Sequence, residues 1–254
     1  IVSEARRRGF FYVGRGSGAN SIVAYLLRIT DVDPMELDLY FERFINLYRT
    51  NPPDFDIDFS WKDRPAMTQY IFKRFKHVAL LGTYVTFKER GVIRELGKVF
   101  GLPPHEIDFL SEGRYNPNEL DQMSKLVLKY GKLLMGKPNY LSIHAGGILI
   151  SEKPLHWFSA THLPPKGFPT TQYDMVIAED VGLYKFDILG QRGLGKIKEA
   201  LEIVAYNQPE KHGDIDIHDI KGFKKDGTIN NLVKTAQCMG CFYVESPAMR
   251  MLLK

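Results

Sequence analysis

The sequence predicts an α+β fold, because strand-like segments precede and follow a long helical block. Residues 53–59 read Pro-Asp-Phe-Asp-Ile-Asp-Phe, and this strict alternation of acidic and apolar residues has the period of two typical of a β-strand. Residues 141–150 and 183–188 also have strand character. Between the first of these strand-like segments and the second, residues 86–143 are predominantly helical in pattern. We therefore expect them to form a helical insertion into the α+β domain.

The acidic strand offers three carboxylates on one face. Asp54, Asp56 and Asp58 project from that face at spacings of about 7 Å, while the intervening apolar residues face a core. Like charges at this spacing repel one another, and a divalent cation such as Mg²⁺ or Mn²⁺ would relieve the repulsion. The pattern therefore indicates a two-metal phosphoryl-transfer site, with an exposed face of hydrated acids as the alternative.

The segment before the acidic strand contains a glycine-rich turn. A short strand at residues 10–13 is followed by Gly14-Arg15-Gly16-Ser17-Gly18-Ala19-Asn20-Ser21 and then by a predicted helix at 22–29. A turn between strand and helix aims backbone N–H groups at phosphate, and Arg15 and Ser17 add further donors. The spacing is not that of a Walker A loop, and a plain turn is the alternative. Arg43 and Arg49 flank the approach to the acidic strand and would either form structural ion pairs or bind a triphosphate.

Three amphipathic helices are predicted at residues 67–77, 88–100 and 118–135, with a short strand or turn at 85–87. The third helix carries Lys125, Lys129 and Lys132 on one face. This row of lysines either follows a nucleic-acid backbone or is simply a solvated helix face. His144, in the strand after the helices, is more typical of a buried, hydrogen-bonded histidine than of a catalytic one.

The strand-like segment near residue 187 supplies another acid. Leu183, Lys185 and Asp187 share one strand face. Asp187 is expected to pair with the first acidic strand as a third metal ligand, and Lys185 to neutralise phosphate charge.

After residue 190 the sequence offers fewer candidates for a site. A helix is predicted at 195–206 and a polar loop at 207–228. The loop includes His212-Gly213-Asp214-Ile215-Asp216-Ile217-His218, which looks like a metal motif but lacks a neighbouring phosphate-type turn. Cys238 and Cys241 provide one pair where a structural zinc needs four ligands, so we expect packed or surface thiols.

Composition is that of a soluble globular protein. The chain has 254 residues, of which 44% are hydrophobic and 25% charged, and its net charge of +4 permits a nucleic-acid partner without requiring one. No apolar run approaches the ~18 residues of a membrane span, and no signal peptide opens the chain. With only two cysteines, these features predict a cytoplasmic protein without a membrane partner. Both ends read as interrupted helices, so we expect an excerpt of a longer protein.

The ordered set of motifs resembles one known family. The glycine-rich turn, Phe41-Glu42-Arg43-Phe44, residues 53–59, His144-Ala145-Gly146-Gly147 and residues 185–190 occur in the order found in the catalytic region of the alpha subunit of bacterial DNA polymerase III, the C family of DNA polymerases. Glu245-Ser246-Pro247-Ala248-Met249-Arg250 also resembles the start of that family's fingers.

The resemblance implies a fold and a division of the chain. The implied fold is a polymerase-β-like nucleotidyltransferase palm with a helical thumb insertion and the truncated start of the fingers. The implied domains are the first part of the palm at 1–85, the thumb at 86–143, the second part of the palm at 144–190 and the start of the fingers at 191–254.

The resemblance also implies a site and its ligands. Asp54, Asp56 and Asp187 match the catalytic acids that hold two Mg²⁺ ions, with Mn²⁺ possible, whereas Asp58 is not counted among them. The implied contacts to the incoming dNTP come from a basic and glycine-containing set: Arg15, Gly16, Ser17, Arg43, Arg49 and Lys185. Primer–template DNA, and in a full-length protein the sliding clamp and other replisome subunits, are the implied partners.

We therefore predict a template-directed DNA polymerase that transfers a nucleotide to a primer 3′-hydroxyl by a two-metal mechanism. The excerpt alone should be weak or inactive, because the fingers that close on the nucleotide are cut short. Two alternatives remain: a metal-dependent nuclease or phosphatase, which needs no triphosphate turn, and a non-catalytic DNA-gripping module that uses the lysine row.

Overall fold

The computed structural model of the chain describes residues 1–48, 52–212 and 215–254. The described residues form two compact units. Unit 1 consists of Ile1–Lys76 and Phe186–Lys254, and unit 2 consists of His77–Lys185. The acidic strand and the glycine-rich turn both lie in unit 1.

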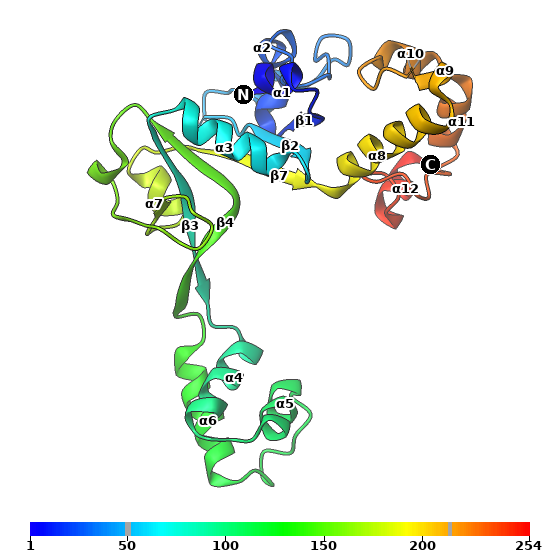
Figure 1. Cartoon of the computed structure of the whole chain (residues 1–254). Coiled ribbons are helices and arrows are strands. Elements are labelled where there is room, and N and C mark those ends of the chain that lie inside the picture. The colour runs from blue at the N-terminus through cyan, green and yellow to red at the C-terminus, as the bar shows by residue number, and fades with distance from the viewer. Residues whose placement is uncertain (49–51, 213–214) are drawn as a thin grey trace. The chain divides into compact units, whose positions relative to one another are not determined.

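Unit 1 is built on three neighbouring strands (Figure 1). The central strand is β2 (Asp56–Ser60), which pairs antiparallel with β1 (Tyr12–Arg15) and parallel with β7 (Lys185–Gln191). Its helices are α1 (Val2–Arg7), η1 (Ser17–Asn20), α2 (Ile22–Leu26), η2 (Phe41–Arg43), α3 (Arg64–Arg74), α8 (Arg192–Asn207), α9 (Pro209–His212), α10 (Ile220–Lys225), α11 (Gly227–Lys234) and α12 (Pro247–Leu253).

The core of unit 1 lies around β2. Phe59 of β2 and Met67 and Ile71 of α3 are fully buried, and the ring of Phe59 lies 6.0 Å from that of Tyr12. Burying side chains of this size is a main source of stability, at about 1.5–3 kcal/mol each. Arg64 ties α3 to the neighbouring strand by donating from Nε to the Ile188 carbonyl at 2.9 Å.

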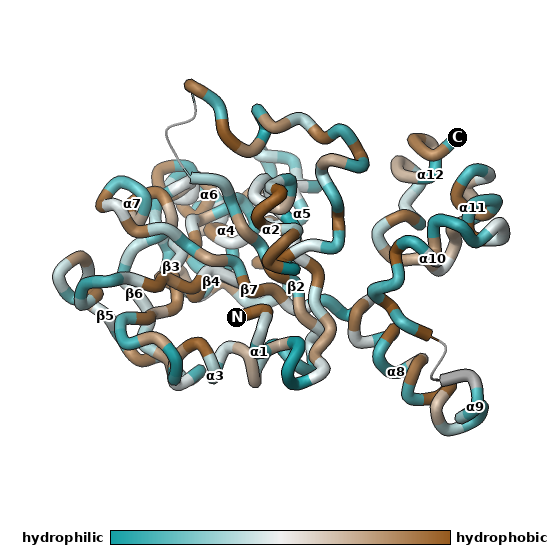
Figure 2. The backbone as a smooth tube through the Cα atoms, turned by 90° about the horizontal axis from the view of Figure 1, so that it is seen from above, coloured by the Kyte–Doolittle hydropathy of each residue, from teal (hydrophilic) through white to brown (hydrophobic). Residues whose placement is uncertain are grey.

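Unit 2 contains a long antiparallel pair of strands, β3 (His77–Thr86) and β4 (Pro138–Ser151), extended by β6 (Thr170–Thr171) and β5 (Thr161–His162) in the order β4-β3-β6-β5. Figure 1 shows three helices at one end of the β3–β4 pair, α4 (Glu89–Val99), α5 (Pro104–Glu112) and α6 (Gln122–Leu134). The unit is completed by η3 (Leu155–Trp157) and α7 (Met175–Asp180). Figure 2 shows hydrophobic residues concentrated along β3 and β4.

Two separate hydrophobic clusters stabilise unit 2. One joins the two long strands to α7 and includes Leu81, Leu149 and Ala178. The other lies within the three helices and is centred on Val92, Ile93, Leu110 and Val127. The helical segment therefore has a core of its own.

Most predicted elements exist, with shifted limits. The three helices predicted at 67–77, 88–100 and 118–135 correspond to α3, α4 and α6. The prediction was wrong for residues 77–86, where a ten-residue strand replaces the short strand or turn expected at 85–87. It was also wrong for the polar segment 207–228, which contains α9, α10 and the start of α11, and α5 was not predicted.

The predicted fold class, a polymerase-β-like palm with a helical thumb insertion and truncated fingers, is not supported. The structure is a mixed α/β fold in which the helical segment continues directly from β3 and into β4. The predicted limits at residues 86 and 143 both fall inside these paired strands. The physical reason is that Val78, Ala79, Leu80 and Leu81 are all buried, so β3 lacks the alternation by which the other strands were recognised.

Among the described residues, none of the helices is both long enough and apolar enough to cross a membrane.

Candidate active site

A row of three charged residues crosses the strands of unit 1. Arg15 of β1 is the direct partner of Asp56 in β2, and Asp56 is the direct partner of Asp187 in β7. Direct partners on neighbouring strands project from the same face of a sheet, with side chains about 5 Å apart. The structure thus brings together Asp56 and Asp187, which are far apart in the sequence, and places a guanidinium beside them.

Burial increases along the acidic strand. Asp54 is exposed just ahead of β2, the side chain of Asp56 is 17% exposed, and that of Asp58 is completely buried. Asp187 is also buried, at 9% exposure. The alternative of an exposed face of hydrated acids therefore does not describe Asp58 or Asp187.

Arg15 neutralises two of these acids. Its Nη1 lies 2.9 Å from Oδ2 of Asp56, and its Nε lies 2.8 Å from Oδ2 of Asp58. The hydrogen bond to Asp58, reinforced by the charges of both carboxylates, raises the pKa of Arg15 above its ordinary value despite partial burial. Arg15 is therefore the counter-ion of Asp56 and Asp58.

Asp58 is the centre of a wider hydrogen-bond network. Besides Arg15, its Oδ2 accepts hydrogen bonds from Nε2 of Gln191 at 3.2 Å and from the hydroxyl of Tyr243 at 2.9 Å. Its Oδ1 is buried and has no hydrogen-bond partner among the described residues. Burial of the phenol, followed by its hydrogen bond to the carboxylate, raises the pKa of Tyr243 to about 12.

The glycine-rich turn is fitted to the start of the acidic strand. The amide of Asp54 donates to Oγ of Ser17 at 3.1 Å, and the carbonyl of Asp54 accepts from the amide of Gly18 at 2.9 Å. Gly16 has a positive φ of 88°, and a Cβ there would lie 2.5 Å from the Asp54 carbonyl oxygen. A Cβ on Gly18 would lie 2.5 Å from the ring of Phe55. The turn therefore has a definite structural role, and its phosphate binding remains a prediction.

The remaining predicted triphosphate contacts are Arg43, Lys185 and Arg49. Arg43 is exposed at the end of η2, which contacts η1 of the glycine-rich turn. Lys185 begins β7 two residues before Asp187 and so shares its strand face. Arg49 lies outside the described residues.

The candidates that the sequence left open have ordinary structural roles. His144 accepts a hydrogen bond at Nδ1 from the amide of Gly147 at 2.7 Å. Nδ1 of His218, from the metal-like motif, lies 3.0 Å from Oδ2 of Asp31, while residues 213 and 214 of that motif are outside the described residues. Cys238 is a buried free thiol and Cys241 an exposed one.

Sequence reasoning missed two members of the acidic network. Gln191 lies four residues after Asp187 on the same strand, and the period of two could have placed it on the same face. Tyr243 comes from the loop before α12, and no local pattern indicated that it would reach β2.

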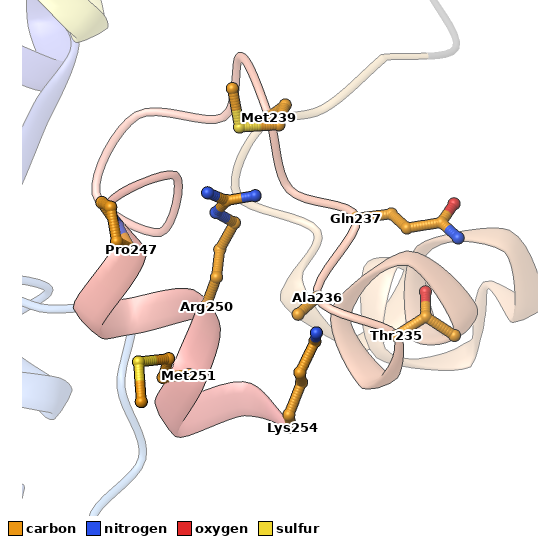
Figure 3. A pocket seen from close by; sticks show the side chains of 8 residues that line it. All are labelled: Thr235, Ala236, Gln237, Met239, Pro247, Arg250, Met251 and Lys254. Carbon is orange, nitrogen blue, oxygen red and sulfur yellow. The ribbon is translucent and has the colours of Figure 1, made fainter.

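A separate cavity of about 490 Å³ lies in the C-terminal part of unit 1 (Figure 3). Its lining comprises Thr235, Ala236, Gln237, Met239, Pro247, Arg250, Met251 and Lys254. Figure 3 shows Arg250 extending from α12 toward Met239, and Lys254 extending toward Ala236. None of the predicted site residues lines this cavity, so it is not part of the acidic site.

The fit of the acidic site to a divalent cation can be judged from its donors. In the part of the chain that the structure describes, no group of three or more His, Cys, Asp or Glu side chains is arranged to hold a metal ion. One observation nevertheless suits a cation: the cationic Arg15 already lies against Asp56, one of the predicted ligands, at 2.9 Å. Carboxylate oxygens are the ligands that Mg²⁺ prefers, so the chemistry of the donor set fits.

Comparison with known proteins assigns the family. A family model described as "Bacterial DNA polymerase III alpha NTPase domain" matches residues 1–190. The chain belongs to the bacterial DNA polymerase III alpha family. This confirms the resemblance drawn from the ordered motifs. It also overturns the predicted palm with a separate thumb, because the match treats residues 1–190, including the helices between β3 and β4, as one NTPase domain.

Curated relatives agree with this family membership. The chain is 36% identical over 261 residues to "DNA polymerase III subunit alpha" of Bacillus subtilis, an alignment that covers 95% of this chain and 23% of that protein. It is 33% identical over 273 residues to "Error-prone DNA polymerase" of Symbiobacterium thermophilum, covering 99% of this chain and 24% of that protein. The chain thus spans about a quarter of the length of these polymerase III alpha relatives.

Proposed function

We propose that this chain contributes the nucleotidyl-transfer site of a template-directed DNA polymerase, which joins a dNTP to a primer 3′-hydroxyl. The observation that carries the proposal is the pairing of Asp56 with Asp187 on neighbouring strands, beside the cationic Arg15. Membership of the DNA polymerase III alpha family supports it. Two acids from distant segments on one sheet face suit phosphoryl transfer, in which charge neutralisation is the main requirement.

Asp54, Asp56 and Asp187 would hold two Mg²⁺ ions, and Mn²⁺ would also suit these oxygen ligands. When bound, such ions supply acidification of the primer hydroxyl and neutralisation of the pyrophosphate that leaves. Asp54 is positioned by the glycine-rich turn, since Ser17 and Gly18 hold its backbone amide and carbonyl. Asp56 and Asp187 are positioned by the strand pairing itself.

The triphosphate would be bound by Arg15, Gly16, Ser17, Arg43, Arg49 and Lys185. Arg15 offers a planar guanidinium, which binds phosphate oxygens through two parallel hydrogen bonds. The Ser17 hydroxyl accepts a hydrogen bond from Asp54 and keeps its own proton to donate. The absence of a side chain on Gly16 allows the turn to lie directly against the Asp54 carbonyl, which keeps these groups next to the acids.

Primer–template DNA is the proposed macromolecular partner. Lys125, Lys129 and Lys132 are exposed on α6 and form a cationic surface suited to a phosphate backbone. In a full-length polymerase the sliding clamp and other replisome subunits would be further partners. The chain by itself should be weak or inactive, because it spans only about a quarter of the length of its relatives.

The test is primer extension by a polypeptide that contains this chain, comparing Asp56→Asn with Asp63→Asn. Asp63 is a buried acid of the same unit, but it accepts from Nζ of Lys198 at 2.9 Å and is not in the charged row. We expect Asp56→Asn to lower the extension rate by at least about a hundredfold, since charge stabilisation dominates this chemistry. We expect Asp63→Asn to lower stability without an effect of that size on extension. Near-normal extension by Asp56→Asn would reject the proposal.

A second measurement separates polymerase from nuclease or phosphatase. Only the polymerase needs a triphosphate turn, so dNTP with Mg²⁺ should slow amide hydrogen exchange at residues 14–21. Exchange there that is unchanged by dNTP would favour the nuclease or phosphatase.

A further inference from the structure

The buried acid Asp58 is not among the predicted metal ligands, yet its Oδ2 accepts hydrogen bonds from Arg15, Gln191 and Tyr243. We propose that Asp58 is a positioning residue that holds Arg15 in place for the triphosphate, and that Tyr243 and Gln191 in turn hold Asp58. This inference rests on the proposed function, because it specifies how one phosphate-binding side chain is oriented. The evidence is the arrangement of donors around the two ends of the guanidinium.

The two ends of the Arg15 guanidinium are in different environments. Nε is bound to Asp58, whose side chain is 0% exposed, whereas Nη1 is bound to Asp56, whose side chain is 17% exposed. The contact at the buried end is the one that solvent and ligands reach least. When a nucleotide arrives, Nη1 exchanges Asp56 for a phosphate oxygen while Nε stays on Asp58. Asp56 is then released for its own role.

Asp58 is itself held from two sides. Gln191 donates from the neighbouring strand β7, and Tyr243 donates from the loop that precedes α12. Tyr243 has a left-handed backbone conformation, with φ of 71°, which is uncommon for a residue of this size. The adjacent Phe242 packs where Gly193 of α8 has no side chain, since a Cβ there would lie 2.5 Å from the ring. The C-terminal segment is therefore shaped to bring the hydroxyl of Tyr243 to Asp58.

Stability alone is a poor explanation for this arrangement. A buried carboxylate carries a desolvation cost, and replacement of such a group by apolar residues is often neutral or stabilising. Here all three donors converge on Oδ2, while Oδ1 remains buried without a partner among the described residues. A buried acid oxygen without a partner calls for an explanation other than stability. The network instead fixes one oxygen, and that oxygen holds Nε of Arg15.

A double-mutant cycle tests the proposal. The affinity for a fluorescent dATP analogue with Mn²⁺ is measured without DNA, in a polypeptide that contains this chain, for wild type, Asp58→Asn, Arg15→Met and the double variant. We expect each single substitution to weaken nucleotide binding by about tenfold, and the double variant to bind no more than about twofold more weakly than Arg15→Met. Arg15→Lys should not restore affinity, because it keeps the charge but loses the Nε donor. Asp63→Asn is the matched control for loss of a buried acid.

Two further readouts separate the competing roles of Asp58. Mn²⁺ binding without nucleotide, measured by electron paramagnetic resonance, should be weakened much less by Asp58→Asn than by Asp56→Asn, because Asp58 is not a metal ligand. Thermal unfolding identifies a purely structural role. If Asp58→Asn does not fold, Tyr243→Phe carries the test, since it leaves Asp58 intact: we expect weaker nucleotide binding with Arg15 present and no effect with Arg15→Met.

The outcomes distinguish failure of the proposed function from failure of the positioning role of Asp58. If the losses in the two single variants multiply in the double variant, the positioning role of Asp58 is overturned. A loss of Mn²⁺ affinity in Asp58→Asn as large as that in Asp56→Asn would also overturn it. Wild-type protein that binds no nucleotide would overturn the proposed function and this inference with it. Nucleotide binding with independent losses would overturn this inference alone.

Discussion

Replacement of Gly16 by alanine tests how the glycine-rich turn is joined to the acidic strand. Gly16 has φ of 88° and ψ of 179°, a conformation that is almost restricted to glycine and costs another residue about 1–3 kcal/mol. The new Cβ would also lie 2.5 Å from the carbonyl oxygen of Asp54 and 3.1 Å from its carbonyl carbon. Both are backbone atoms of the segment that leads directly into β2, so this segment must shift.

A control at Gly9 separates the cost of the clash at Gly16 from the cost of a positive φ. Gly9 also has a positive φ, of 66°, but a Cβ there would meet nothing within 4 Å. Gly9→Ala therefore measures the conformational cost alone, about 1 kcal/mol. We expect Gly16→Ala to lower the free energy of unfolding by about 3 kcal/mol, because a clash with backbone adds to the conformational cost.

The assay is urea unfolding of wild type and both variants, monitored by circular dichroism, together with nucleotide affinity. Gly16→Ala should also weaken nucleotide binding, because the displaced strand carries Asp56, and Gly9→Ala should not. Equal losses of stability in the two variants would show that Gly16 does not lie against Asp54, and the reasoning about the turn would then fail.

Further substitutions test the core of unit 1, the lysine row of α6 and the phenol of Tyr243. Phe59→Ala, at a fully buried position of β2, should lower the free energy of unfolding by about 3–5 kcal/mol in the same urea assay; a loss below 1 kcal/mol would contradict the assignment of the core. The double substitution of Lys125 and Lys129 by Glu should change the free energy of unfolding by less than about 0.5 kcal/mol, because both side chains are exposed. It should weaken DNA binding and reduce the salt dependence of that binding. Unchanged binding in a fluorescence anisotropy titration would show that the lysine row is only a solvated helix face. Tyr243→Phe should remove the phenol whose pKa is raised to about 12, so a spectrophotometric titration should lose one late-ionising tyrosine. A raised pKa favours the folded state below pH 10 and disfavours it as the pH rises toward 12. The variant should therefore resist alkaline unfolding better than wild type.

The sequence was most informative where local periodicity determines structure. The alternation at Asp54, Asp56 and Asp58 predicted a strand with the acids on one face, and β2 begins at Asp56. The expectation that Asp187 would lie beside that strand agrees with the direct pairing of Asp56 and Asp187. Both inferences depend only on which face of a strand a residue occupies.

The sequence was least informative where contacts between distant segments determine burial and side-chain partners. The burial of Asp58 depends on Arg15, Gln191 and Tyr243, which come from three different segments. Arg15 was expected to face a phosphate, but its partners in the structure are two carboxylates. The strand at residues 77–86 was missed because residues 78–82 are all buried, so this stretch does not alternate.

The decisive experiment is a crystal structure of the protein soaked with Mg²⁺ and a dNTP. We expect two cations held by Asp54, Asp56 and Asp187, the triphosphate against residues 14–21, and Arg15 turned from Asp56 to a phosphate oxygen while its Nε stays on Asp58. A nucleotide bound elsewhere, for example in the cavity beside Arg250, with Arg15 still joined to Asp56, would contradict it.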